Sequence, residues 1–345
     1  MKKLSWFNKA VFILNVLVAI GTLLGYVLPF LAPKLFPFLS VFTLILPSLI
    51  LTNFVFLVYW AIQVKRQMIL SALILVLGIT FITKFYKITG KNEPTEPSDI
   101  VLMTYNVRLF NLFKWIPDEF VPQKIKEFVD LQDPDILCLQ EYSKGAALDF
   151  KQFPYKYIVS HGEKIKTGQA IYSKYRIIDK GEINLPNSNN NVIFADLVID
   201  SDTIRVYSIH LQSISISPDI HEKIDEEKSK RIFRRISNAF TEQQMQSELI
   251  QSHMKDATHR KVICGDMNNS AFSYVYSNIK GDLKDAFIEA GSGFGKSYDF
   301  PYYPMRIDYV FVDPSIEVKS FKTHSDFRNS DHFPIVTRLV IPTRD

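Results

Sequence analysis

Long uncharged stretches occupy the first quarter of the chain, and shorter apolar runs are spread over the rest. No charged residue occurs between Ala10 and Leu31, or again between Leu35 and Val64. Each stretch is long enough to cross a bilayer, whereas core helices of soluble proteins rarely lack charge over such a length. A third run, Met68–Thr83, is shorter and is also typical of a re-entrant, interfacial or buried helix. We expect about three transmembrane helices, at roughly residues 10–31, 38–63 and 68–86.

The basic residues that flank these helices predict their orientation. Lysines precede the first helix, and Lys65 and Arg66 separate the second from the third, whereas only Lys34 lies between the first and second. Because basic loops tend to remain in the cytoplasm, the amino terminus is expected there, and three crossings place the rest of the chain on the extracytoplasmic side. Two crossings instead of three would place the rest of the chain in the cytoplasm. The lysines that follow the third run also argue against an extracytoplasmic location.

The remainder of the chain is predicted to form one soluble domain. A polar segment with two prolines, Lys91–Asp99, indicates a linker, so we expect a membrane anchor at residues 1–90, a linker at 91–99 and a domain at 100–345. Eight short runs in this domain have the pattern of β-strands, and helices are expected at Gln123–Leu131 and at about Ile224–Met254. Such a mixture indicates an α/β fold with two packed sheets flanked by helices, although a doubly wound sheet has a similar pattern.

Side chains that bind hard cations end two of the predicted strands. Glu141 follows the apolar run Ile136–Leu139, and Asn106 ends another run. Oxygen ligands at the mouth of a buried strand suit Mg²⁺, although a single glutamate there is more often a surface residue. Asn106 would bind either the metal or a phosphate oxygen.

The segment GDMNN is more informative. Gly265 permits a tight turn at the end of a strand, and alternate residues of an extended segment, here Asp266 and Asn268, point to one side. Asp266 would then position a water molecule and Asn268 a phosphate. A turn stabilised by its own aspartate and asparagine explains the segment equally well.

Two of the seven histidines lie in strand-like contexts that suit proton transfer near neutral pH. His210 closes one apolar run, and His332 directly follows Asp331. Because adjacent side chains of an extended segment diverge, Asp308 on another strand is a better partner for His332 than Asp331 is. The other five have polar or loop-like neighbours and are expected at the surface: His161, His221, His253, His259 and His324.

Taken in order, the motifs TYN, LQE, HL, GDMN, IDYVF and SDHFP resemble those of the endonuclease/exonuclease/phosphatase family, which has the deoxyribonuclease-I-like fold. The resemblance spans about Ile100 to Ile341 and is specific as an ordered set. It implies a four-layer α/β sandwich that cleaves phosphate esters with activated water and Mg²⁺, for which Mn²⁺ would substitute.

The resemblance also implies roles for the motif residues. Glu141 would be the principal metal ligand, with Asn106 beside it and Asp331 as a further carboxylate on the metal side. Asp266 would orient or activate the attacking water, and Asn268 would hold the phosphate.

The histidines would serve the same reaction. His332, paired with Asp308, would be a general base or a stabiliser of the transition state, and His210 would bind the scissile phosphate and assist the leaving group. Two departures from the family pattern stand out. Met267 occupies a position where phenylalanine is common, and no carboxylate can be identified as the partner of His210.

The substrate and partners are less constrained. The net charge of +4 is too small to demand an anionic partner, and the basic helical face around Arg231 would suit either nucleic-acid phosphates or plain solvation. We expect a membrane-anchored nuclease first and a sphingomyelinase-like or other phospholipid phosphodiesterase second. A binding module without catalysis is a third possibility, and no protein partner is indicated. Cys138 and Cys264 lie in apolar runs and are expected to be buried free thiols.

Overall fold

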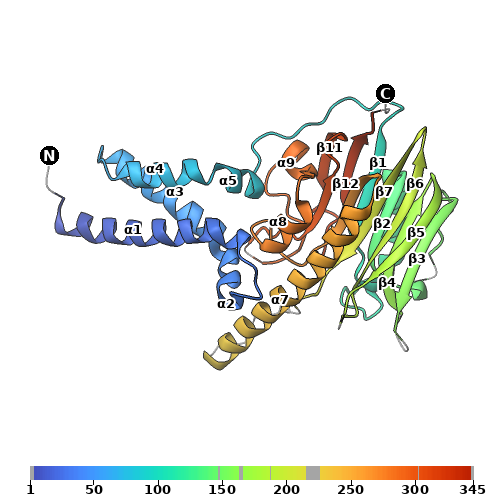
Figure 1. The fold of residues 1–345 in the computed structure, drawn as a ribbon, viewed down its shortest axis with the longest axis horizontal. Coiled ribbons are helices and arrows are strands. Elements are labelled where there is room, and N and C mark those ends of the chain that lie inside the picture. The colour runs from blue at the N-terminus through green and yellow to red at the C-terminus, as the bar shows by residue number, and fades with distance from the viewer. Residues whose placement is uncertain are drawn as a thin grey trace.

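The computed structural model describes residues 4–146, 148–162, 166–186, 188–214, 226–301 and 303–342. Two six-stranded sheets lie face to face, and the helices of the first 85 residues extend from one end of this sandwich (Figure 1). The α/β sandwich preceded by apolar helices, predicted from the sequence, is therefore confirmed.

Each sheet contains one central pair of parallel strands. In the order β11-β12-β1-β2-β4-β3 the parallel pair is β1 and β2, and in the order β5-β6-β7-β8-β10-β9 it is β7 and β8. The first sheet consists of β1 (Ile100–Asn106), β2 (Ile136–Tyr142), β3 (Tyr155–His161), β4 (Thr167–Ser173), β11 (Glu317–Thr323) and β12 (Ile335–Val340). The second consists of β5 (Arg176–Asn184), β6 (Asn191–Ile199), β7 (Asp202–His210), β8 (Arg260–Asp266), β9 (Lys284–Asp285) and β10 (Asp308–Val312).

All eight runs predicted as strands form strands, and the four strands that were missed, β3, β5, β9 and β11, are the four sheet edges. An edge strand borders solvent and therefore needs fewer apolar residues than a central one. β5 shows this most clearly, because none of its nine residues is buried. The missed strands are thus those that lack a strongly apolar pattern and are defined mainly by their pairing with one neighbouring strand.

Three apolar clusters hold four layers together. One lies between the sheets and contains both Cys138 and Cys264, which are buried free thiols as expected. A second joins the outer face of the first sheet to α6 (Val121–Gln132). The third joins the outer face of the second sheet to α7 (Glu226–Asp256) and α8 (Tyr274–Lys280). A short helix, α9 (Ala286–Ala290), closes one end.

The amino-terminal region contains two segments long and apolar enough to cross a membrane, Trp6–Phe30 and Pro37–Ile62. They are built from α1 (Trp6–Val27), η1 (Leu28–Phe30), α2 (Pro37–Ser40), η2 (Val41–Ile45) and α3 (Leu46–Ile62). Their outward faces expose large apolar side chains such as Leu17 and Phe54. Their buried face instead carries polar side chains that bond across helices: the Asn53 amide donates to Thr22 at 2.7 Å. Apolar exteriors with polar contacts inside are typical of helices packed in lipid.

The third expected helix is not continuous. α4 (Met68–Leu77) and α5 (Ile79–Phe85) meet at Gly78 with a bend of 69°. The Tyr26 hydroxyl donates to the carbonyl of Ile74 at 3.1 Å beside this break, and a Cβ atom on Gly78 would lie 1.9 Å from that hydroxyl. A side chain inserted against the helix backbone explains the bend.

The connection between the first two apolar segments packs against the sandwich domain. The backbone N–H of Lys34 donates to Gln244 of α7 at 2.7 Å. Phe272 joins the apolar cluster of the helices, and Arg306 donates to the carbonyl of Lys84 in α5 at 3.1 Å. The helices and the sandwich therefore share an extensive interface.

Candidate active site

The fold brings the ends of five strands to one edge of the sandwich. Because the central strands of each sheet run parallel, Asn106 and Glu141 lie at the carboxyl ends of β1 and β2, and His210 and Asp266 at those of β7 and β8. β10 runs antiparallel to β8, so its first residue, Asp308, pairs directly with Asp266. Register within each sheet and the packing of the two sheets thus place these side chains around one pocket.

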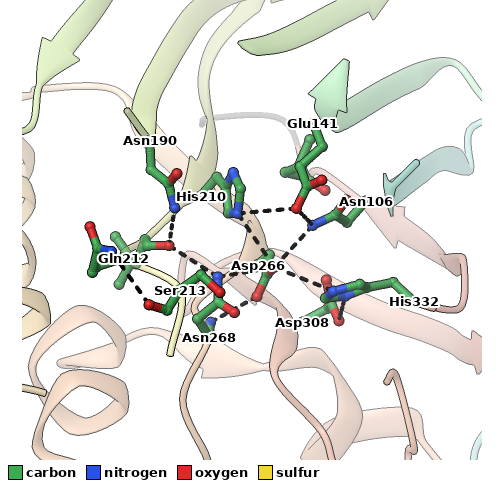
Figure 2. A network of polar contacts seen from close by, with 12 residues as sticks. Asn106, Glu141, Asn190, His210, Gln212, Ser213, Asp266, Asn268, Asp308 and His332 are labelled. Atoms are coloured by element: carbon green, nitrogen blue, oxygen red, sulfur yellow. Dashed lines mark hydrogen bonds and ion pairs between the residues drawn. The ribbon is translucent and has the colours of Figure 1, made fainter. Parts of the chain in front are cut away.

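Asp266 is the centre of the pocket, and the side chains of Figure 2 converge on it. Its carboxylate accepts hydrogen bonds from the Asn106 amide at 3.0 Å, and from the backbone and side chain of Asn268 at 2.7 and 3.2 Å. The Nε2 atoms of His210 and His332 lie 3.7 and 3.6 Å from the same carboxylate. Asp266 is only 1% exposed, so nearly all of its neighbours are protein groups.

His332 bonds through Nδ1 to Asp308 at 2.9 Å, and its other ring nitrogen faces Asp266. The neighbouring Asp331 points elsewhere, accepting from Ser330 at 3.2 Å and pairing with Arg108 at 3.3 Å. The side chains of Asp331 and His332 therefore diverge, as expected for neighbours in an extended segment, and the predicted pairing of His332 with Asp308 is the one observed.

The charges of the pocket follow from burial and from the carboxylates. Burial lowers the pKa of His332, but Asp308 and Asp266 outweigh it and raise that pKa to about 10. Burial raises the pKa of Asp266 to about 8. Burial, reinforced by the charge of His332, lowers the pKa of His210 to about 4. At neutral pH the pocket therefore holds a charged His332 and a neutral His210.

Glu141 reaches the pocket through an irregular backbone. Its φ of 48° lies in the left-handed region, beside a register shift between β2 and β4. Such a conformation costs a non-glycine residue on the order of 1 kcal/mol or more, and strain of this kind is common at functional sites. The carboxylate accepts from the Asn106 amide at 3.2 Å, lies 3.8 Å from His210 and remains partly open to solvent.

The GDMNN segment has features of both roles that the sequence left open, a turn stabilised by its own side chains and a part of the site. Asn268 has a φ of 49°, and its backbone bonds to Asp266, so the two residues do stabilise their own turn. The Asn268 side chain nevertheless lies beside the Asp266 carboxylate and donates to the carbonyl of Leu211 at 3.0 Å.

His210 has no carboxylate within hydrogen-bonding distance among the residues that the structure describes; the nearest, on Asp266 and Glu141, lie 3.7 and 3.8 Å away. Its Nε2 atom is buried and makes no hydrogen bond. A buried nitrogen without a partner, facing two carboxylates, leaves room for a ligand that bridges them. An oxygen-rich donor set of this kind fits a hard divalent cation together with a phosphate.

Two residues that the sequence did not single out also reach the site. The Tyr298 ring lies 4.9 Å from that of His332, and burial, with the charges of nearby carboxylates, raises its pKa to about 12. Arg108 pairs with Asp331 and stacks over Trp115 at 4.3 Å. Tyr298 lies in a loop and Arg108 begins a short 3-10 helix, η3 (Arg108–Asn111), so no repeating pattern in the sequence signals their role.

The expectation that the remaining histidines are surface residues is wrong for His324. It is buried against Phe128, with ring centroids 5.1 Å apart, because the loop that carries it folds back over α6. His221 lies outside the described residues.

Comparisons with known proteins agree with this architecture. The family model "Endonuclease/Exonuclease/phosphatase family" matches residues 103–332, and a model of a domain of unknown function matches residues 8–85. No curated protein matches the sequence significantly.

Solved structures resemble the sandwich at low identity. TDP2 of D. rerio in complex with a single-strand DNA product has a TM-score of 0.53 at 14% identity, over 70% of this chain and 99% of its own. The human Nocturnin catalytic domain with bound sulfate has 0.52 at 16%, over 72% and 97%. A mannosyl-6-phosphatase of Bacteroides thetaiotaomicron has 0.50 at 20%, over 70% and 99%. At such identities the likeness shows the fold.

Proposed function

Because this chain belongs to the endonuclease/exonuclease/phosphatase family, whose members are phosphoester hydrolases that generally depend on divalent metals, we propose that it cleaves phosphodiester bonds, with nucleic acid as the first candidate substrate. The observation that carries the proposal is the buried Asp266 carboxylate. It lies between a charged His332–Asp308 pair and a neutral His210, beside the partly open Glu141.

We assign the metal site to Glu141, with Asn106 beside it and with Mg²⁺ as the ion, for which Mn²⁺ would substitute. Asp331, which pairs with Arg108 at 3.3 Å, would be a further carboxylate on the metal side. A bound Mg²⁺ would neutralise charge that develops on the phosphoryl oxygens. Asn106 directs its amide nitrogen at Glu141 and Asp266, while its oxygen accepts from the backbone of Arg108 at 3.1 Å. Its first role is therefore to hold the two carboxylates in place.

Asp266 is the group that we assign to the attacking water. Burial raises its pKa above that of an ordinary carboxylate, so its ionised form is a stronger base. Asn268 would hold a phosphoryl oxygen with its amide, in exchange for one of the two bonds that this amide donates to Asp266 and to the carbonyl of Leu211.

Of the two roles open to His332, the electrostatics favour the stabilisation of the transition state. A ring whose pKa is raised to about 10 by two carboxylates is already protonated at neutral pH, so it cannot accept a proton but can face developing negative charge. His210 is neutral, and its unbonded Nε2 would donate to the phosphate or the leaving oxygen.

Two observations bear on the substrate. The neighbour with a DNA product bound supports nucleic acid as the first candidate. The packing of the apolar helices against the sandwich favours a phospholipid or sphingolipid headgroup as the second, since it would keep the pocket near a bilayer. A binding module without catalysis is disfavoured, because all the reactive side chains meet in one pocket.

We further propose a membrane anchor at residues 1–90, a linker at 91–99 and a catalytic domain at 100–345. The segment between the first two apolar helices packs on α7 and α8, so it must lie on the same side of the membrane as the sandwich. Three crossings meet this condition and two do not. With the basic residues before the first helix and between the second and third helices kept in the cytoplasm, the sandwich would lie on the extracytoplasmic side.

The decisive experiment uses the full-length protein in lipid nanodiscs, with plasmid DNA and sphingomyelin as substrates and with Mg²⁺ or a chelator. We expect DNA cleavage that requires Mg²⁺. Glu141→Gln and His332→Ala should each lower turnover by at least about a hundredfold. Glu119→Gln is the control, because that glutamate is exposed and pairs with Lys114 at 3.6 Å instead of with a residue of the pocket. Release of phosphocholine alone would favour the lipid substrate, and a Glu141→Gln protein as active as the parent would refute the proposed metal site.

A further inference from the structure

A groove of about 580 Å³ lies beside the active-site pocket. Arg231, Arg234 and Arg235 of α7 line it on one side, and Gln212 and Ser213 on the other. The residue before Gln212 is Leu211, whose carbonyl accepts the Asn268 side chain inside the pocket. The two depressions therefore adjoin along the segment that follows β7, as the positions of Gln212 and Ser213 in Figure 2 indicate.

The described residues that line the groove carry a net positive charge, because three arginines face one glutamate, Glu242. Arg231 and Arg234 are exposed, and neither makes an ion pair with any residue that the structure describes. Glu226, in the first turn of α7, pairs with Lys230 at 2.6 Å. An anion in the groove would gain two uncompensated guanidinium groups, which bind phosphate in a bidentate manner.

The amino-terminal half of α7, which carries these arginines, packs beside the ends of the apolar helices. Figure 1 shows the first turns of α7 reaching back beside α2. The Phe233 ring stacks on Phe38 at 5.9 Å and contacts Phe42 at 6.3 Å, and both partners are largely exposed on their other sides. Exposed aromatic rings next to arginines are typical of protein surfaces that meet the boundary between lipid tails and headgroups.

We propose that this arginine groove binds the phosphate headgroups of anionic phospholipids in the bilayer that holds the helices. Nucleic acid is a poorer occupant, because none of the residues that line the groove is aromatic and base stacking would find no platform. The proposal rests on the membrane placement proposed above but not on the catalysed reaction. Headgroups held there would fix the distance of the pocket from the bilayer.

The test measures binding by the full-length protein in neutral detergent. The probes are short-chain phosphatidylglycerol, short-chain phosphatidylcholine, inorganic phosphate and a thymidine oligonucleotide. We expect preferential binding of phosphatidylglycerol, and a loss of about thirtyfold in the double variant Arg231→Gln/Arg234→Gln, since each basic residue near an anionic surface contributes a factor of about five. The control variant Lys151→Gln/Lys156→Gln removes the same charge from exposed positions near the start of β3 and should bind normally.

Three results would overturn the proposal. Equal affinity for phosphatidylglycerol and inorganic phosphate would mean a site for free phosphate, and stronger binding of the oligonucleotide would mean a nucleic-acid groove. Unchanged lipid binding in Arg231→Gln/Arg234→Gln would exclude the groove. The Glu141→Gln variant separates this proposal from the catalytic one, because it should lose hydrolysis and keep lipid binding.

Discussion

Substitution of Gly265, the residue before Asp266, is the most direct test of the structure. Its φ is +126°, and a Cβ atom there would lie 2.2 Å from the carbonyl oxygen of Ile209 and 3.0 Å from the Gln140 amide. The first contact is with backbone of the adjacent strand β7, which cannot move without disturbing the pairing of His210 with Asp266. Gly265→Ala should therefore affect both stability and catalysis.

The expected loss follows from two separable terms. Placing alanine at this φ costs about 1–3 kcal/mol, and the overlap with a fixed backbone adds about 1–3 kcal/mol. A total near 4 kcal/mol would lower the melting temperature by roughly 8–16 °C, taking about 2–4 °C per kcal/mol for a domain of this size. Turnover should fall as well, since the displaced β8 carries Asp266.

Thermal unfolding of the full-length protein, followed by tryptophan fluorescence, measures this loss. Gly293→Ala is the matched control, because Gly293 also has a positive φ, of +65°, but nothing lies within 4 Å of its added Cβ. It should show only the strain, about 1–2 kcal/mol. Equal melting temperatures for the two variants would refute the close approach of β7 and β8 at Gly265.

Three further predictions follow from the charges. Asp308→Asn should move the alkaline limb of the pH profile of kcat/KM towards neutrality. His332 in the folded parent protein is charged below its pKa of about 10 and loses this charge as the pH rises through that value. Asp308→Asn removes the main cause of the raised pKa. An alkaline limb that does not move would exclude His332 as the cation. Arg306→Met leaves the buried Asp285 unpaired and should cost about 3–5 kcal/mol in thermal unfolding, whereas Arg328→Met, in an exposed pair with Asp299, should cost less than about 1 kcal/mol; similar losses would contradict the burial of the first pair. Mg²⁺ at a hundredfold excess over its Kd should stabilise the protein by about 2.7 kcal/mol, and Glu141→Gln should abolish this gain; a variant stabilised as much as the parent would place the ion elsewhere.

The interior strands and the reactive residues at their ends could be predicted from the sequence because both depend on local pattern. A strand buried on both faces must be apolar along its length, and a polar residue that ends such a run must reach its edge. Glu141, His210 and Asp266 were found in this way. The apolar helices were predictable for the same reason, since a long run without charge is itself a local pattern.

Contacts between distant residues were decided by the tertiary structure alone. Asn106 meets Asp266 across 160 positions of sequence, and Arg108 meets Asp331 only because the segments after β1 and before β12 close over the same edge. The edge strands, the bend at Gly78 and the burial of His324 depend likewise on a partner that no local pattern contains. The sequence by itself determined which side chains end the central strands. Only the packed sheets decided which of them meet, and at what charge, because both pairing and burial are properties of the whole fold.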